Sequence, residues 1–202
     1  MARPTLTESE VELVREKVCD AARGLFCKHG LDNVGLRMMG AEVNLTGAAL
    51  YRYFPQGREE IIAAVRTRAF RELADLSAEA VASTQTPLDR FRGVAAAYVE
   101  LAHRDPVSYR MLFSLMQTGD FPELRKEARR ARDILFRAAQ AAAHSEEADE
   151  QGRVLAHVAW AAIHGAVMLE TSEMLQMGVD IGQLVDGIAL ALLHLSGQPP
   201  VS

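Results

Sequence analysis

The chain has 202 residues, of which 49% are apolar and 6% aromatic, and its formal net charge is −5. This length allows one large or two small domains with a sizeable core, and a composition rich in Ala and Leu favours helices over sheets. No run of about 18 uncharged apolar residues is present, and the first residues lack the apolar core of a secretory signal. We therefore expect an all-α protein of the cytoplasm, without a membrane span.

The charges are unevenly distributed along the chain. Residues 1–71 hold eleven basic and nine acidic side chains, whereas residues 72–202 hold eleven basic and eighteen acidic ones. A mildly basic first part attached to an acidic second part orients the first part toward a polyanion. This asymmetry is consistent with a nucleic-acid partner despite the negative total.

The first predicted helix begins at a capping box. Thr7 is followed three positions later by Glu10, and an apolar stripe at helical spacing then runs to Gly30. Cys19 and Cys27 lie eight positions apart on this helix, about 12 Å along its axis, which is too far for a disulfide. We expect two reduced thiols, and a redox-sensing role for Cys27 is the alternative.

Residues 36–65 predict two short helices joined by a tight turn and followed by a third helix. The first short helix is expected at Leu36–Val43, Asn44 suits the left-handed geometry of a turn, and Thr46 can cap the next helix, expected at Gly47–Tyr53. Hydroxyls and a guanidinium on the outer side of that helix would suit DNA phosphates. The side chains expected there are Tyr51, Arg52 and Tyr53.

Two motifs resemble those of the tetracycline-repressor (TetR) family of bacterial regulators. Residues 25–30, Leu-Phe-Cys-Lys-His-Gly, match the Phe-x-x-x-Gly end of the family's first helix, and residues 50–55, Leu-Tyr-Arg-Tyr-Phe-Pro, match its Leu-Tyr-x-aromatic-Phe run. The resemblance implies that Tyr51 and Tyr53 contact phosphates, while Thr46 opens the recognition helix. It also implies that Arg37 faces the DNA backbone and that Arg58 stands near the position of a family lysine.

The chain departs from the family's pattern at the turn and after it. The turn glycine is Asn44 here, and the position after Thr46, where the family often has a long side chain, is Gly47. Direct recognition of bases would then rest on Thr46, Arg52 and contacts with thymine methyl groups. The expected DNA-contacting residues are Arg37, Thr46, Gly47, Ala48, Tyr51, Arg52, Tyr53 and Arg58.

The remaining residues predict a helical body. A helix from Gly57 to Ala82 joins the expected DNA-binding domain, residues 8–56, to a ligand-binding and dimerisation domain, residues 57–198, without a flexible linker. Such a helix can transmit a signal between the two domains. The basic run from Arg125 to Arg137 is interpreted as a solvent-facing surface. Further helices are expected at residues 88–104, 106–117, 122–144, 151–177 and 181–195.

The last two predicted helices are apolar around most of their circumference, which indicates burial on more than one side. In a chain of this size a second copy buries one of those sides most easily. Two helices from each protomer would then form a four-helix interface with two-fold symmetry, as TetR-like proteins do. The expected interface includes Leu184, Ile188 and Leu192.

Residues 160–165, Trp-Ala-Ala-Ile-His-Gly, resemble the Trp-x-x-x-His-Gly signature of one C-terminal domain type in the TetR family. Two interpretations stay open. In the first, Trp160 fills the core and His164 forms a hydrogen bond within the bundle. In the second, His164 is a polar group in an otherwise apolar inducer pocket. The walls of that pocket would be Tyr98, Tyr109, Phe113, Met116, Trp160, His164 and Met168.

The sequence has no glycine-rich phosphate loop after a strand, no nucleophile elbow and no metal-spaced set of Cys and His. We therefore expect no enzyme activity, no cofactor and no metal. The expected function is that of a ligand-responsive repressor, a homodimer that binds a palindromic double-stranded DNA operator and is released by a hydrophobic small molecule. The alternative is a helical module that binds small molecules or proteins without recognising a DNA sequence.

Overall fold

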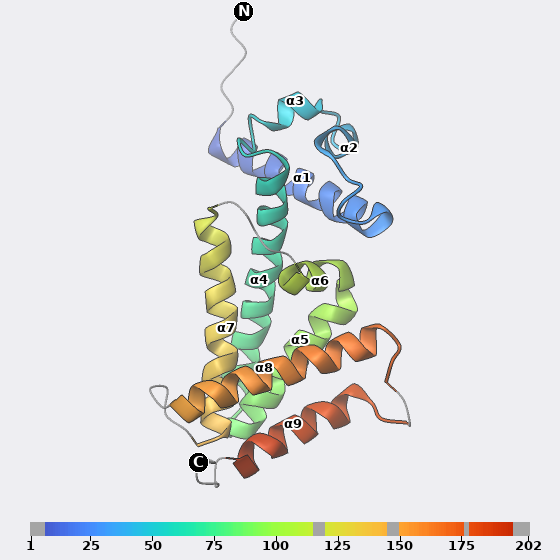
Figure 1. Cartoon of the computed structure of the whole chain (residues 1–202). Helices are drawn as coiled ribbons and strands as arrows, with labels where there is room; N and C mark the ends of the chain where they lie inside the picture. The colour runs from blue at the N-terminus through green and yellow to red at the C-terminus, as the bar shows by residue number, and fades with distance from the viewer. Residues whose placement is uncertain (1–6, 115–119, 145–149, 176–177, 196–202) are drawn as a thin grey trace, which may run out of the picture.

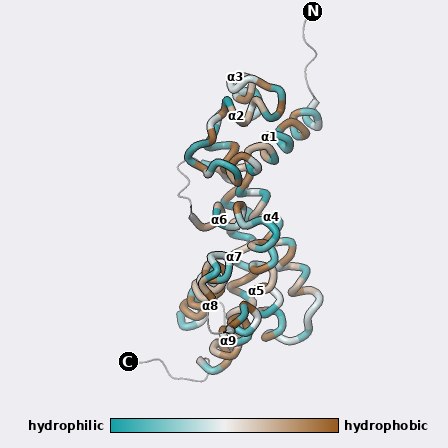
Figure 2. Tube along the Cα trace, turned by 90° about the vertical axis from the view of Figure 1, so that its right-hand side faces the viewer, coloured by the Kyte–Doolittle hydropathy of each residue, from teal (hydrophilic) through white to brown (hydrophobic). Residues whose placement is uncertain are grey.

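The computed structural model describes residues 7–114, 120–144, 150–175 and 178–195, and every regular element in these ranges is an α-helix. This confirms the all-α prediction. Three helices form a head at one end of the molecule, and the long helix α4, Arg58–Ser83, runs from the head into a helical body (Figure 1). A second view agrees that head and body lie at opposite ends of α4 (Figure 2).

The head consists of α1, Glu8–His29, α2, Leu36–Glu42, and α3, Gly47–Leu50. Both halves of the predicted capping box at Thr7 are present, and α1 ends before Gly30. The turn between α2 and α3 has Asn44 at φ 56°, which confirms its left-handed geometry. The side chain of Thr46 accepts a hydrogen bond from the backbone N–H of Ala49 at 3.1 Å, so the predicted cap of α3 is confirmed as well.

The recognition helix is shorter than predicted. It was expected to reach Tyr53, but α3 ends at Leu50 and residues 51–53 form a turn. In this turn the N–H groups of Arg52 and Tyr53 donate to carbonyls only three residues earlier, those of Ala49 and Leu50. This tighter hydrogen bonding is common where a helix ends.

Helix α4 belongs to two hydrophobic cores. Its first turns contribute Ile61, Ile62 and Val65 to the core of the head, whereas Phe70 and Leu73 lie in the core of the body. Between these groups the buried Arg66 donates to the carbonyl of Leu112 at 3.2 Å. The helix therefore couples the two parts through side chains packed at both of its ends.

The body contains α5, Pro87–Arg104, α6, Pro106–Ser114, α7, Pro122–Ala142, α8, Glu150–Thr171, and α9, Ile181–Leu195. Helices α5, α6 and α7 each begin with a proline, whose fixed φ and missing N–H suit the first helical position. Helix α8 ends at Thr171 instead of extending to residue 177, because Glu173 has a φ of 56° and the N–H of Met174 turns back to the carbonyl of Leu169.

Candidate functional site

Several side chains predicted to contact DNA lie on the surface of the head. Arg37, Thr46, Ala48 and Arg52 are exposed, and Tyr51 is 52% exposed. The Tyr51 ring lies against Gly57, where a Cβ atom would come within 3.0 Å of the ring. This contact fixes the position of the Tyr51 ring beside the first turn of α4.

Two of the predicted phosphate contacts are not supported by the structure. Tyr53 is only 9% exposed and belongs to the core of the head, so its expected place on the outer side is wrong. Arg58 donates from Nε to the carbonyl of Val34 at 2.9 Å and from Nη2 to that of Leu31 at 2.6 Å. The Arg58 guanidinium therefore ties the start of α4 to the loop before α2, and most of its donors are already used.

Two glycines allow α2 and α3 to approach each other closely. A Cβ atom at Gly40 would lie 2.6 Å from the carbonyl oxygen of Leu45, and one at Gly47 would lie 3.2 Å from the backbone nitrogen of Arg37. The small residue at position 47, where the family often has a long side chain, therefore has a packing reason. Its side of α3 faces α2.

The body contains a cavity of about 530 Å³ between α4, α5, α6, α7 and α8. Four of the predicted pocket residues line it, namely Tyr98, Phe113, Trp160 and His164. Tyr109 lies behind them and its hydroxyl is 3.2 Å from Nδ1 of His164. Met168 packs against the body core instead of lining the cavity. Met116 lies outside the described residues. The other lining residues are Phe70, Leu112, Arg125, Ala128, Arg129, Ala131 and Arg132.

The cavity has an aromatic and uncharged floor. Phe113 lies at the centre of a ring cluster, with centroid distances of 4.7 Å to His164, 5.2 Å to Tyr109 and 6.2 Å to Trp160. Burial lowers the pKa of His164, so its imidazole is neutral at physiological pH. Burial likewise raises the pKa of Tyr98 and keeps its hydroxyl protonated. The floor thus offers apolar surface with one neutral polar group.

Three arginines of α7 also line the cavity, although the sequence did not predict them as pocket residues. Arg125, Arg129 and Arg132 belong to the basic run that was interpreted as solvent-facing. They are exposed, as expected, but they also border the cavity. Their spacing of four and three positions places them on one face of a helix, and this pattern could have suggested a shared target.

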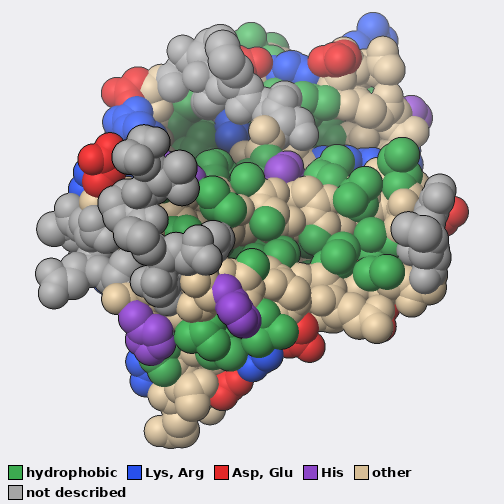
Figure 3. Space-filling model, turned by 60° about the horizontal axis from the view of Figure 1, so that its bottom comes forward, with side chains coloured by type: hydrophobic (Ala, Val, Ile, Leu, Met, Phe, Trp, Pro, Cys, Tyr) green, Lys and Arg blue, Asp and Glu red, His purple; other side chains and the backbone are tan. Residues whose placement is uncertain are grey.

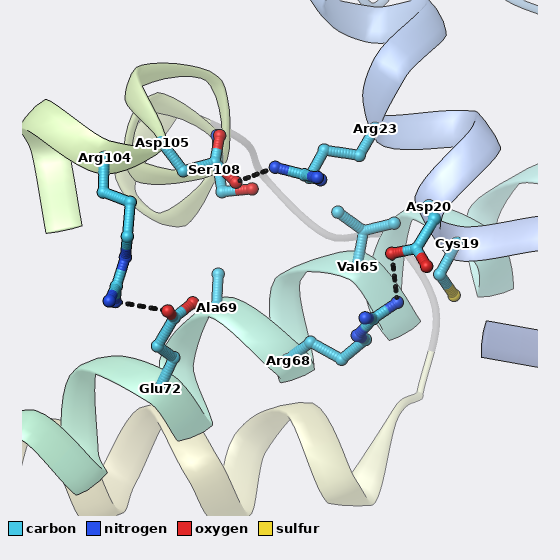
Figure 4. Close-up of a pocket in the computed structure, with 10 residues that line it drawn as sticks. All are labelled: Cys19, Asp20, Arg23, Val65, Arg68, Ala69, Glu72, Arg104, Asp105 and Ser108. Atoms are coloured by element: carbon cyan, nitrogen blue, oxygen red, sulfur yellow. Dashed lines mark hydrogen bonds and ion pairs between the residues drawn. The ribbon is translucent and has the colours of Figure 1, made fainter. Parts of the chain in front are cut away.

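A second, smaller cavity of about 250 Å³ lies where the head meets the body (Figure 4). Two ion pairs join α1 of the head to the rest of the molecule here, Arg23 to Asp105 at 2.9 Å and Arg68 to Asp20 at 3.0 Å, and Arg104 pairs with Glu72 beside them. Burial alone would raise the pKa of Asp105, but hydrogen bonds from Ser108 and Arg23 outweigh it and hold this pKa below its ordinary value. Burial raises the pKa of the neighbouring Cys19 to about 11, so this thiol is unreactive at neutral pH.

Helix α6 touches both the head and the large cavity. Met111 and Val107 of this helix pack in the core of the head, while Leu112 and Phe113 line the cavity and Tyr109 lies behind it. A shift of α6 would therefore change both the packing of the head and the shape of the cavity. The sequence predicted this coupling for α4 alone.

Helices α8 and α9 leave an apolar face uncovered. Figure 3, which brings the end of the molecule carrying these helices forward, shows hydrophobic side chains gathered over its centre. Five large residues of the two helices are between 38% and 57% exposed: Val154, Val158, Leu169, Leu190 and Leu193. By length and composition α8 is the one described helix that could cross a membrane, and 33% of its most apolar window is buried in the protomer.

The predicted dimer residues lie on a different face of α9. Leu192 is 2% exposed and belongs to the body core, and Ile188 packs against the same core. Leu184 is half-buried. The expectation that Leu192 meets a second copy is therefore wrong, because its stripe of α9 already packs within the protomer. The exposed stripe contains Leu190 and Leu193 instead.

Comparison with known families agrees with this architecture. Residues 18–65 match the family described as bacterial regulatory proteins of the tetR family, and residues 91–192 match the tetracyclin repressor-like C-terminal domain. The chain belongs to the TetR family. As a TetR-family protein it is a DNA-binding transcriptional regulator and not an enzyme. Both predictions made from the sequence are confirmed.

Solved structures share the fold over nearly the whole length of this chain. The regulatory protein SCO4313 is 25% identical, with a TM-score of 0.73 over 94% of this chain and 100% of its own. The fatty acid degradation regulator FadR from Bacillus halodurans is 12% identical, with a TM-score of 0.69 over 94% and 97%. A TetR/AcrR regulator from Thermobifida fusca is 20% identical, with a TM-score of 0.58 over 89% and 96%. No curated protein sequence matches significantly.

Proposed function

We propose that this TetR-family regulator is a repressor that binds a palindromic operator as a homodimer and leaves it when a small molecule fills the large cavity. The observation that carries the proposal is helix α6, which contributes to the core of the head through Met111 and to the cavity through Phe113. A ligand releases DNA only if it binds two arrangements of the heads with different affinity. A cavity wall that is also part of the head provides such a difference.

The DNA contacts that we propose are those of exposed side chains. Tyr51 and Arg52 would bind phosphates, Arg37 would face the backbone from α2, and Thr46 with Ala48 would enter the major groove. Gly47 would allow the close approach of α2 to α3. Tyr53 and Arg58 are left out, because one is buried and the other holds two carbonyls.

The dimer that we propose uses the exposed stripe of α8 and α9. Val154, Val158, Leu169, Leu190 and Leu193 would pack against the same residues of a second copy, in a four-helix arrangement. Gly165 and Gly187 support close helix packing there, since a Cβ atom at either would meet nothing within 4 Å. Pairing of two copies would cover the apolar face of α8 without a membrane, in keeping with a cytoplasmic protein.

The division of labour between the two domains follows from this arrangement. Residues 8–56, together with the first turns of α4, would bind DNA, and the rest of residues 57–198 would bind the ligand and the partner. The Trp160–Gly165 segment supports the resemblance to the Trp-x-x-x-His-Gly type of C-terminal domain, because Trp160 and His164 both line the cavity. The effector would be a largely hydrophobic small molecule, held by the aromatic floor.

A gel-shift titration with the DNA that flanks the protein's own gene tests the proposal. We expect Arg52→Ala and Tyr51→Phe each to weaken binding and to reduce its dependence on salt, since each loses a phosphate contact. Leu13→Ala is the control, because Leu13 is an exposed residue of α1 without a proposed contact. If the parent protein binds this DNA no better than unrelated DNA, the chain acts as a binding module without an operator, an alternative favoured by the short side chains of α3.

A further inference from the structure

The rim of the large cavity is strongly basic, although the body around it is acidic. Helix α7 has six basic and three acidic residues, and residues 72–202 as a whole have eleven basic and eighteen acidic ones. Three of the six, Arg125, Arg129 and Arg132, border the cavity and reach solvent. More than half of the basic side chains of the body are therefore on one helix, and half of those face one opening.

The three guanidinium groups are only partly compensated by nearby carboxylates. Arg125 pairs with Asp120, and Arg132 donates to its neighbour Asp133 at 2.7 Å. Both of these pairs are well exposed and contribute little to stability. Within the part of the chain that the structure describes, the Arg129 side chain forms no ion pair or hydrogen bond, although it lies between the other two along the helix. The rim therefore keeps a net positive charge.

Below this rim the cavity offers no charge to a ligand. Its floor consists of Phe70, Leu112, Phe113 and Trp160, together with Tyr98 and the neutral His164. A ligand that was apolar throughout would leave the arginines without a partner, and one that was charged throughout would be desolvated against aromatic rings. The two zones are complementary to the two ends of an amphipathic molecule.

We propose that the effector is an amphipathic organic anion, whose apolar chain or ring fills the aromatic floor and whose single oxyanion is bound by Arg129 with help from Arg125 and Arg132. The inference rests on the proposed function and narrows its hydrophobic effector to one with an anionic head. Guanidinium groups bind carboxylates and phosphates through paired hydrogen bonds, so either head would fit. The cavity volume of about 530 Å³ is in the range of small-molecule sites.

The chain carries its own reporter for a binding experiment. Trp160 is the single tryptophan and lines the cavity, so its fluorescence reports directly on occupancy. Decanoate, decyl phosphate, decanol and decylamine share one apolar chain and differ in the head, and they are titrated below their micelle concentrations at neutral pH. We expect the two anions to bind more tightly than the alcohol, and the amine to bind most weakly. Comparison of decanoate with decyl phosphate shows which oxyanion is preferred.

Variants of one helix separate a binding role from a structural one. Arg129→Gln should weaken the binding of decanoate by about tenfold and leave the binding of decanol unchanged, since one charge-assisted contact is lost. Arg129→Glu should reverse the order, so that decylamine binds better than decanoate. Lys126→Gln is the matched control, because Lys126 lies on the same helix, pairs with Glu123 and does not line the cavity.

The outcomes distinguish this inference from the proposed function. Equal binding of decanol and decanoate, or decanoate binding that Arg129→Glu leaves unchanged, would overturn the anion proposal while leaving the repressor intact. Failure of all four probes to alter Trp160 fluorescence would also overturn it. If decanoate binds in an Arg129-dependent way but does not release the protein from DNA, the ligand class stands and the proposed coupling to the head is wrong.

Discussion

Removal of the Arg58 side chain should lower the stability of the fold rather than remove a DNA contact. The guanidinium joins the first turn of α4 to the carbonyls of Leu31 and Val34, at 2.6 Å and 2.9 Å. Arg58→Ala deletes both donors, and the carbonyl of the buried Val34 loses its charged partner. The loop between α1 and α2 would then lose its attachment to α4.

The size of the effect follows from these contacts. A hydrogen bond to a charged group contributes about 1.5–3 kcal/mol when it is well shielded. The Arg58 side chain is 30% exposed, so water replaces part of this interaction, and we expect a total loss of about 2–3 kcal/mol in the free energy of unfolding. For a chain of this length, such a loss lowers the melting temperature by roughly 5–10 °C.

Thermal unfolding followed by circular dichroism, together with DNA titration at low temperature, measures the two effects separately. Arg52→Ala is the matched control, since the Arg52 side chain is exposed and forms no hydrogen bond or ion pair within the described residues. Arg52→Ala should leave the melting temperature unchanged and weaken DNA binding. An Arg58→Ala protein that melts with the parent, but binds DNA with a reduced salt dependence, would show that Arg58 is a phosphate contact and that the tie is unimportant.

Three further predictions concern the junction, the dimer and the turn. Asp105→Asn should lower the melting temperature by roughly 3 °C at neutral pH; because the folded-state pKa of Asp105 lies below its ordinary 3.8, this difference should persist down to about pH 3.8 and disappear below it. Val158→Asp should produce monomers in light scattering, since it places a charge in the apolar stripe. Gly40→Ala should cost about 1–3 kcal/mol, since its Cβ would lie 2.6 Å from a carbonyl oxygen.

Each of these has a control and a contrary outcome. If the melting temperature of Asp105→Asn stayed below that of the parent by the same amount from neutral to strongly acidic pH, the charge of the carboxylate would not be the source of the stabilisation. Leu13→Asp puts the same charge on exposed apolar surface of α1 and should leave the oligomeric state unchanged. Gly24→Ala, on the open side of α1, should stabilise by up to about 1 kcal/mol. If Gly40→Ala and Gly24→Ala change the stability equally, a Cβ atom at position 40 is accommodated without a steric penalty.

Local signals in the sequence were sufficient for most helix boundaries. The capping side chains of Thr7 and Thr46 and the prolines at positions 87, 106 and 122 act within a few residues of themselves, so their effect can be predicted without the rest of the fold. The left-handed turn at Asn44 was predictable for the same reason. Four cavity residues were also predicted, because bulky aromatic residues on adjoining helices tend to meet.

The errors in the candidate site all depend on contacts between distant parts of the chain. Arg58 is occupied by carbonyls more than twenty residues earlier, and Leu192 packs inside its own protomer although the periodicity of α9 is equally compatible with the opposite face. Tyr53 is buried in the core of the head, whose other members come mainly from α1 and α4. Helical spacing defines which residues share a face of a helix, but not whether that face contacts the core, a second copy or solvent.

The sharing of α4 and α6 between two cores limits how this regulator can be recombined with its relatives. A chimera cut at residue 56 would separate Ile61, Ile62 and Val65 from the helices they pack against, and would pair a foreign head with Met111 of the original α6. A workable transplant would carry α4 as far as Arg66 and replace Met111 and Val107 to match. A new combination of ligand-binding domain and DNA-binding head would then require compatible packing between the head and α6. The head and the α6 residues that contact it would therefore have to be exchanged together, in evolution as in engineering.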